Sequence, residues 1–412
     1  MPQTQAPART DWSLVLLVLG AGIVAGCQVG KVPPSLPSLR AELHLSLFAA
    51  GWVISLIGLL AACGGAVAGA TADWLGHRRV VLLGLSVTAV ASVLGSLAQG
   101  PGWLLFTRVL EGIGYIAISV AGPVLILQVT RPRDERLALS VWAGYMPAGT
   151  SLMLLVSPLF LQPVGWRGLW VVNGFLVAGV ALLLAWKIPH PIRNTGGKPT
   201  RFFPELKATF ARPGPLVLAL YFGAFALQFM AVVGFLPTLL IEEVGLDKGV
   251  AAALAGVAVL LNVPGNLVGG WLLHRGVRRT LSLGLASLVM GLCVLGIYSP
   301  FLPGALRYVL CLVFTGVGGV IPASLYAAAP LHAPSRSALG TTNGIMMQGG
   351  NLGSMLGPPA MAAVVAGVGG WHAAPWLLVS AAGVSLALAV WLDRIEAAAA
   401  AAAFRGAGTA TQ

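Results

Sequence analysis

The sequence predicts an all-α membrane protein with twelve transmembrane helices in two related halves, and three observations support this fold class. Of the 412 residues, 57% are hydrophobic and only 9% are charged, whereas soluble domains carry about 25% charged residues. The mean hydropathy of +0.89 agrees. Apolar stretches of about 20 residues, the length that crosses a bilayer, recur along the whole chain. Polar motifs of the first half also return in the second half.

The predicted helices follow from where the apolar stretches stop. The first begins after ten largely polar residues, without a cleavable signal peptide, and a polar hinge at 69–79 separates the second from the third. The basic segment 189–213 separates the sixth from the seventh, and a second hinge at 270–279 separates the eighth from the ninth. The twelve predicted spans are 12–34, 47–71, 79–99, 103–129, 137–162, 168–188, 214–241, 249–273, 280–299, 305–330, 338–367 and 371–392.

The positive residues are distributed unequally between the two sides of these spans. Eighteen of the 24 lysines and arginines lie in the N-terminus, in loops that follow even-numbered helices, or in the tail. The positive-inside rule therefore places both termini in the cytoplasm and predicts a multi-pass protein of the bacterial cytoplasmic (inner) membrane. The net charge of +12 reflects this topology, so no nucleic-acid partner is expected.

The two hinges are the clearest sign of an internal duplication. The first runs from Gly69 to Arg79 and the second from Gly270 to Arg279, each with a late glycine and a basic pair. Other pairs recur in the same order, such as Gln28 with Gln228. The predicted units are a six-helix bundle at 1–188, a cytoplasmic linker at 189–213, a second bundle at 214–392 and a cytoplasmic tail at 393–412. Such duplication is typical of secondary transporters.

The first hinge resembles the loop 2–3 signature of the major facilitator superfamily, G-x-x-x-D-R/K-x-G-R-R/K. The matching residues are Gly69, Asp73, Gly76, Arg78 and Arg79. The sequence departs from the signature at Trp74, where the family has a basic residue. The stretch from Arg108 to Gly114 resembles the family's helix-four motif, R-x-x-x-G. The resemblance implies two bundles that rock about a central site, and a loop 2–3 latch that closes the cytoplasmic side.

The chemistry of the first hinge fits such a latch. Gly69 allows close helix approach, and Asp73 is placed to accept charge-assisted hydrogen bonds from an arginine or from helix N-terminal amides. We therefore expect Gly69, Asp73, Gly76, Arg78 and Arg79 to act in gating. A purely topological role for the two arginines is the alternative. In the second hinge His274 stands where the first has an aspartate, which predicts unequal halves.

Three ionisable residues fall within predicted spans, and such residues normally face a cavity. Arg108 and Glu111 are three residues apart on one helix and are expected to pair. That pairing leaves Lys31 as an unneutralised charge, so the cavity is expected to favour an anionic solute. Snorkelling of Lys31 to the outer interface is the alternative. Glu111 is the predicted proton-coupling residue. Burial favours the protonated form of a carboxyl group, whereas the neighbouring Arg108 favours the ionised form.

Other polar and aromatic residues within the spans complete the predicted site. With Lys31 and Arg108, the expected substrate-binding residues are Gln28, Tyr115, Gln228, Asn262 and Tyr326. The alternatives are interhelical hydrogen bonding for the amides and simple packing for the tyrosines. Gly349, Gly353 and Gly357 have the spacing of a helix contact.

These features predict a secondary active transporter for a small anionic or polar organic solute, driven by proton-coupled alternating access. The alternatives are a proton-coupled drug exporter and, less favoured, a metal-ion transporter that uses methionine sulfurs. An enzyme is not expected, since catalytic residues at suitable spacing are missing. We expect no cofactor and no metal, a small-molecule substrate, a surrounding lipid bilayer and a monomer.

Overall fold

The structure is a computed structural model of the chain. It describes residues 9–131, 134, 138, 141, 142, 144–188, 207–334 and 339–409. Within these ranges the side chains at 60, 61, 64–67, 69, 70, 73, 74, 339, 340 and 399–409 are not described. Every regular element among the described residues is a helix, which confirms the predicted all-α class.

The helices of the first half begin with a broken span. The described elements are α1 (Trp12–Gly30), α2 (Val32–Leu43), α3 (Leu47–Leu75), α4 (His77–Ser96), α5 (Pro101–Val129) and α7 (Tyr145–Lys187). The prediction that the first span ends at residue 34 is wrong, because α2 continues it to Leu43. Pro33 and Pro34 start a new helix rather than ending the old one, since the first turn needs no intrahelical N–H donors.

The long helix α7 covers two predicted spans, 137–162 and 168–188. Its 43 residues turn at Gly165, where φ is 65°, a conformation that favours glycine. Ten helical stretches among the described residues are long and apolar enough to cross a membrane. When α7 counts as two spans and the 29-residue α3 is added, they match the twelve predicted spans.

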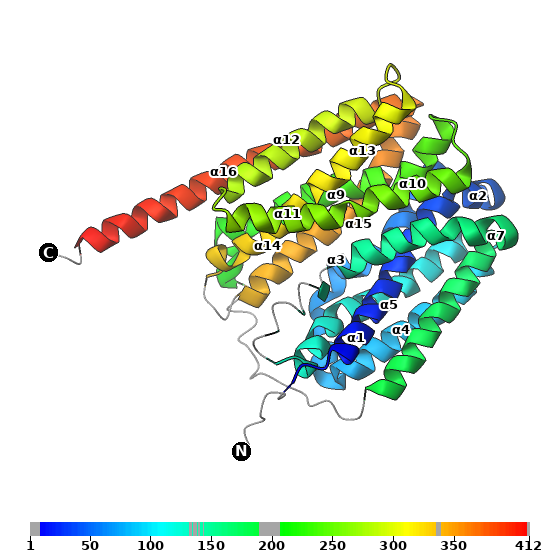
Figure 1. The fold of residues 1–412 in the computed structure, drawn as a ribbon, viewed down its shortest axis with the longest axis horizontal. Coiled ribbons are helices and arrows are strands. Elements are labelled where there is room, and N and C mark those ends of the chain that lie inside the picture. Colours follow the sequence, from blue (N-terminus) through cyan, green and yellow to red (C-terminus); the bar gives the residue numbers. More distant parts are fainter. Residues whose placement is uncertain are drawn as a thin grey trace.

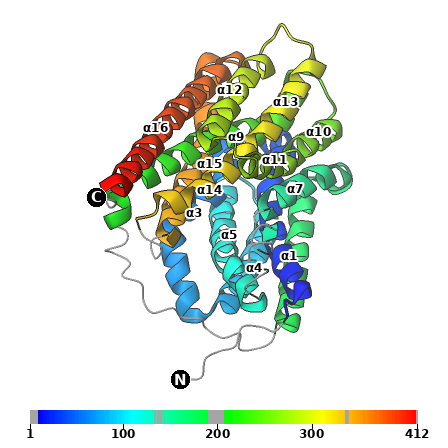
Figure 2. The same ribbon diagram turned by 60° about the vertical axis from the view of Figure 1, so that its left-hand side comes forward.

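The second half repeats this plan. Its elements are α9 (Pro213–Glu242), α10 (Lys248–Leu260), α11 (Asn262–His274), α12 (Arg279–Ile297), α13 (Gly304–Gly318), α14 (Val320–His332), α15 (Leu339–Val368), the short 3-10 helix η2 (Trp371–Ala373) and α16 (Ala374–Thr409). α16 continues beyond residue 392 through most of the predicted tail. Figures 1 and 2 show the helices of the two halves gathered on opposite sides of the molecule.

Glycines allow the helices within each bundle to touch through their backbones. A Cβ atom at Gly149 of α7 would meet the α1 backbone, and one at Gly353 of α15 would meet the backbone of Gly223 in α9. Gly349 and Gly357 face α9 in the same way, which confirms the predicted helix contact. Close packing of this kind holds membrane helices together where no hydrophobic effect acts between them.

The two bundles meet at one end of the molecule, which we call the closed end and define by residues 43–47, 162–167 and 242–248. There α2 contacts α9, α3 contacts α15 and α7 contacts α10. The backbone of Gly51 in α3 packs directly on Pro358 and Pro359 of α15. The Ser151 hydroxyl donates a hydrogen bond to the carbonyl of Gly256 across the interface, at 2.9 Å.

Candidate substrate and coupling site

Lys31, Arg108 and Glu111 meet in the interior of the first bundle, and we call them the buried cluster. Nζ of Lys31 lies 2.6 Å from Oε1 of Glu111, and Nη1 of Arg108 pairs with Oε2 of the same carboxylate. None of the three side chains has exposed surface. Two positive groups against one negative group leave one net positive charge in the cluster. Buried charge is costly in a membrane protein and usually marks a functional site.

The local sequence explains why Lys31 reaches this place. It occupies the junction of α1 and α2, where its backbone N–H still donates to the carbonyl of Cys27 at 3.0 Å. Its ammonium group makes three contacts: with Glu111, with Oε1 of Gln28 at 2.8 Å and with the Ser92 hydroxyl at 2.9 Å. These three acceptors match the three N–H donors of a protonated lysine.

The ring of Trp170 forms another wall of the buried cluster. The Lys31 ammonium lies 4.5 Å from the centroid of this ring, which is the geometry of a cation–π contact. Trp170 is itself fully buried. Its carbonyl accepts a hydrogen bond from the Ser92 hydroxyl at 2.8 Å. α1, α4, α5 and α7 therefore all contribute to the surroundings of Lys31.

Arg108 is held by backbone carbonyls from two other helices. Its Nε donates to Val53 in α3 and its Nη1 to Gln28 in α1, both at 3.0 Å. Nη2 of Arg108 is buried and has no hydrogen-bond partner among the described residues, and the same holds for Nε1 of Trp170. The buried cluster thus carries spare hydrogen-bond donors as well as spare positive charge.

The predicted state of Lys31 needs correction. The pairing of Arg108 with Glu111 is confirmed. The expectation that this pairing leaves Lys31 without a counter-charge is wrong. One carboxylate oxygen of Glu111 contacts Lys31 and the other contacts Arg108. Snorkelling is also excluded, since the Lys31 side chain is fully buried. The single net positive charge remains, but the whole cluster carries it.

Gln28 belongs to the same network. Its side-chain nitrogen donates to Oδ1 of Asn173 in α7 at 2.8 Å, while its side-chain oxygen accepts from Lys31. Ser92, Trp170 and Asn173 were not predicted as site residues. A serine, a tryptophan and an asparagine in apolar helices resemble ordinary packing residues, so only the fold reveals that they surround Lys31.

A second group of polar side chains lies on the faces where the two bundles meet. The hydroxyl of Tyr145 lies 3.1 Å from that of Tyr115 and 2.9 Å from that of Ser119. Tyr326 of the second bundle is 39% exposed and lies close enough to both tyrosines for an electrostatic interaction. Its ring also packs edge-on against Phe222 of α9, with centroids 6.1 Å apart. Aromatic groups of both bundles therefore lie near one another, and Tyr326 is the partly exposed member of the group.

The remaining predicted binding residues make hydrogen bonds within the second bundle. Gln228 donates to the carbonyl of Leu378 at 2.7 Å. Asn262 donates to the carbonyl of Thr315 at 3.2 Å and accepts from the Asn266 amide at 3.0 Å. The structure does not bring these two amides into contact with the buried cluster, and their role in binding stays a prediction.

The predicted latch is described only in part. Gly76 ends α3 with φ at 90°, in the region that favours glycine. Arg78 donates to the carbonyls of Ile188 and Ala185, both at 2.7 Å, at the C-terminal end of α7, where positive charge is favourable. Arg79 is exposed. The side chains at Gly69 and Asp73 lie outside the described residues, so the gating role stays a prediction.

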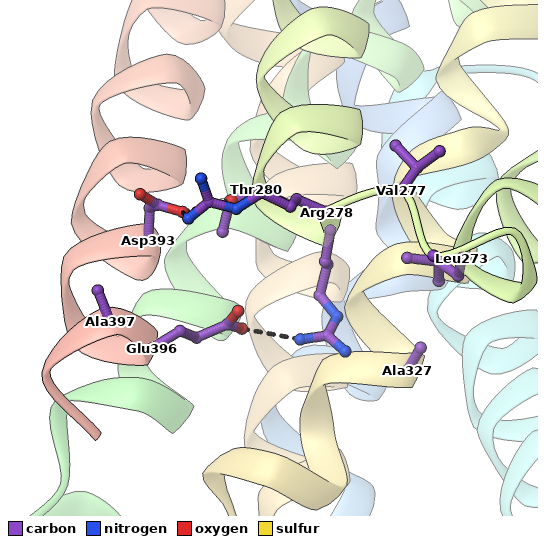
Figure 3. Close-up of a pocket in the computed structure, with 10 residues that line it drawn as sticks. Leu273, Val277, Arg278, Thr280, Ala327, Asp393, Glu396 and Ala397 are labelled. Carbon is purple, nitrogen blue, oxygen red and sulfur yellow. Dashed lines mark hydrogen bonds and ion pairs between the residues drawn. The ribbon is translucent and has the colours of Figure 1, made fainter. Parts of the chain in front are cut away.

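The second hinge makes an equivalent connection with different chemistry. Gly276 has φ at 81°, and Arg278 lies 3.0 Å from Asp393 of α16. Arg279 lies 2.8 Å from Glu396, also in α16. Figure 3 shows Arg278 and Asp393 pointing toward one another at the edge of a surface pocket. Both hinges thus tie the start of one helix to the last helix in its bundle, near the end of α7 in the first half and in the second half of α16 in the other.

Comparison with known proteins decides the family. The family model described as Major Facilitator Superfamily matches residues 18–339. The chain belongs to the Major Facilitator Superfamily. A bacterial homolog of the human lysosomal transporter Spinster, solved in an inward-facing and unoccupied conformation, has the same fold: the TM-score is 0.79 at 16% identity, covering 93% of this chain and 97% of that one.

Two curated relatives of this superfamily member match along most of their length. The 3-(3-hydroxy-phenyl)propionate transporter of Escherichia coli K12 is 29% identical, covering 86% of this chain and 88% of the relative. The gallate transporter of Pseudomonas putida is 25% identical, covering 75% and 74%. The puromycin resistance protein of Streptomyces alboniger is 30% identical over 53% of this chain, and the match spans only 42% of that protein.

Proposed function

We propose that the chain is a secondary active transporter that moves a small organic anion with an aromatic ring across the inner membrane by proton-coupled alternating access. The observation that carries this proposal is the buried cluster, in which Lys31 and Arg108 share one carboxylate. Its net positive charge has no solvent to stabilise it and is neutralised by one carboxylate group from a substrate.

Spare hydrogen-bond donors support a carboxylate in particular. Nη2 of Arg108 is buried and unpartnered among the described residues, and an arginine fork binds carboxylates through two parallel N–H groups. Arg108 and Lys31 are therefore the proposed anion-binding residues, with Gln28 positioning both. Glu111 is the counter-charge through which proton movement is coupled to binding.

The aromatic part of the substrate has a matching surface. Tyr115, Tyr145 and Tyr326 offer ring faces and hydroxyl groups from both bundles, and such groups suit a hydroxylated ring. The two relatives matched along most of their length are transporters of gallate and of 3-(3-hydroxy-phenyl)propionate, both aromatic carboxylates. Gln228 and Asn262 are proposed to contribute from the second bundle once it moves.

The proposed transport cycle uses the closed end as its outer gate. The distribution of positive residues predicts that this end lies outside, and in the proposed cycle the contacts of α2, α3 and α7 with the second bundle seal the outer face. Opening that end requires them to break while the cytoplasmic latch at Gly69, Asp73, Gly76, Arg78 and Arg79 forms. When the outer contacts break only as the cytoplasmic latch forms, the central site opens to one side of the membrane at a time.

Drug export is the second candidate, because several relatives are resistance proteins. The puromycin and tetracenomycin C resistance proteins match over 53% and 42% of this chain, and over only 42% and 33% of their own length. Puromycin carries an amino group that is a cation when protonated. A site with a net positive charge disfavours such a substrate, so we place drug export second.

A thermal-shift screen of the purified protein separates the two candidates. Gallate and 3-(3-hydroxyphenyl)propionate are expected to raise the unfolding temperature, and puromycin and methyl viologen are not. The stabilisation should disappear in Arg108→Gln and persist in Arg307→Gln, a control arginine that is also buried but lies in α13 of the second bundle. Stabilisation by the two cations alone would overturn the proposal in favour of a drug exporter.

A further inference from the structure

The charge balance of the buried cluster raises the question of which group carries the coupled proton. The charged and titratable groups that interact with Lys31 are Glu111, Arg108 and the Cys27 thiol. Its remaining neighbours are the neutral side chains of Gln28, Ser92 and Trp170. When both cations are charged, the cluster holds one unbalanced positive charge, and its three side chains have no exposed surface. A buried unbalanced charge is unstable, and loss of one proton removes it.

Glu111 is poorly suited to carry that proton. Each of its carboxylate oxygens already accepts a hydrogen bond from a cation, one from Lys31 and one from Arg108. Protonating Glu111 would place a hydrogen against one of these donors and raise the net charge of the cluster further. Arg108 is also excluded, because a guanidinium does not lose its proton in proteins.

We propose that Lys31 is the residue that binds and releases the coupled proton, and that Glu111 stays ionised as its counter-charge. This inference rests on the proposed function and assigns the coupling chemistry within that site. The step is R–NH₃⁺ to R–NH₂ plus H⁺, with the proton passing to water when the bundle opens. Protonated Lys31 gives the cluster one positive charge that a carboxylate neutralises, and deprotonated Lys31 leaves a neutral empty cluster.

The hydrogen bonds around Lys31 provide the structural signal of this switch. The ammonium donates to three acceptors: Gln28, Ser92 and Glu111. A neutral amine has only two N–H groups, so one of these contacts must be given up on deprotonation. Gln28 also bonds Asn173 of α7, and Ser92 bonds the carbonyl of Trp170. Loss of the contact with Gln28 or Ser92 would therefore change a residue that also ties α7 to α1 or α4.

The first test needs no substrate. An ammonium above an indole ring perturbs its absorbance and fluorescence, and Lys31 lies 4.5 Å from the Trp170 ring centroid. A pH titration of tryptophan fluorescence in detergent is expected to show a step that disappears in both Lys31→Met and Trp170→Phe. Lys187→Met is the matched control, because Lys187 lies 4.4 Å from the Trp186 ring centroid at the end of α7. A step retained in Lys31→Met would contradict the proposal.

The second test measures coupling in proteoliposomes with labelled 3-(3-hydroxyphenyl)propionate. Lys31→Arg keeps the positive charge but cannot release the proton. We expect slower exchange of labelled for unlabelled probe, because Lys31 also contacts the anion, but accumulation driven by a pH gradient, measured relative to that exchange, should fall at least tenfold. Retained exchange also shows that the variant is folded. Gradient-driven accumulation equal to wild type in Lys31→Arg would overturn the assignment.

The two tests separate this inference from the proposed substrate class. A Lys31-dependent fluorescence step in a protein that moves neither aromatic acid would leave the proton assignment standing and reject the substrate. Transport of the aromatic acids with no such step, and with normal coupling in Lys31→Arg, would keep the substrate and reject the proton assignment.

Discussion

Nη1 of Arg40 lies 3.2 Å from Oε1 of Glu242, and this ion pair joins the two bundles at the closed end. The other carboxylate oxygen of Glu242 accepts a hydrogen bond from the Trp371 indole at 2.9 Å. In the first bundle, the equivalent Glu42 also accepts from an indole, that of Trp166, but its second partner is Arg167 of the same bundle at 2.7 Å.

A single sequence difference accounts for this asymmetry. The residue after the tryptophan is Arg167 in the first bundle and His372 in the second. Glu242 instead accepts a hydrogen bond from Arg40 of the opposite bundle. Glu42 therefore makes an ion pair within its own bundle, whereas the equivalent Glu242 makes an ion pair across the interface between the bundles.

Breaking this pair is expected to favour opening of the closed end. The pair is partly exposed, so Arg40→Ala should cost about 0.5 kcal/mol and change the ratio of closed to open molecules about twofold. Spin labels at His44 and Lys248, on the two sides of the interface, would report the populations by distance measurement. Arg278→Ala breaks an exposed pair inside the second bundle and should leave the distances unchanged. Identical populations in wild type and Arg40→Ala would argue against a gating role.

Removing the shared carboxylate should damage the protein more than removing an exposed one. Glu111→Gln leaves two buried cations without a counter-charge and should destabilise the fold by about 3–5 kcal/mol. Glu42→Gln removes a carboxylate that is 48% exposed and should cost about 1 kcal/mol or less. Thermal unfolding of both variants makes the comparison. Equal losses of stability would contradict the assigned burial and charge of the cluster.

The contact between α9 and α15 in the second bundle can be tested by replacing a glycine with alanine, which adds one methyl group. Gly353→Ala pushes a Cβ atom into the backbone of Gly223, and such overpacking should cost about 1–3 kcal/mol. Gly344→Ala lies on the same helix, where a Cβ atom would meet nothing within 4 Å, and should be neutral or slightly stabilising. Unfolding temperatures that fall equally in both variants would show that α9 and α15 do not pack as described.

Recognition of a ring hydroxyl is expected to depend on Tyr145. Tyr145→Phe removes the hydroxyl that contacts Tyr115 and Ser119, and loss of about 1 kcal/mol weakens binding about fivefold. We expect this loss for 3-(3-hydroxyphenyl)propionate but not for unsubstituted phenylpropionate. Tyr221→Phe is the control, because its hydroxyl donates to the carbonyl of Leu283 inside the second bundle. Equal weakening of both ligands would remove Tyr145 from ring recognition.

The helices and their duplication could be predicted because bilayer thickness and local composition determine them. The break at Lys31 was not predicted, whereas the turn at Gly165 falls between the predicted spans 137–162 and 168–188. Two prolines can either end a helix or start the next, and only packing decides between these outcomes. α16 extends to Thr409, through most of the segment that was predicted only as a cytoplasmic tail, since an alanine-rich run shows helix propensity but not where the helix ends.

The candidate site could be predicted only where its residues are close in sequence. Arg108 and Glu111 are three residues apart, so helix geometry predicts their pairing. Lys31 lies 80 residues from Glu111, and its partner depends on how α1 packs against α5. The sequence pattern therefore predicted the Arg108–Glu111 pair but left Lys31 without the partner that the fold gives it.

Accumulation of an aromatic acid against its gradient is the most direct test of the central claim. Wild-type protein in proteoliposomes, given labelled 3-(3-hydroxyphenyl)propionate and an imposed pH gradient, should concentrate the anion several-fold. A protonophore should abolish this accumulation while exchange continues, because exchange needs no net proton movement. Accumulation that is indifferent to the protonophore, or uptake that never exceeds equilibration, would contradict proton-coupled anion transport.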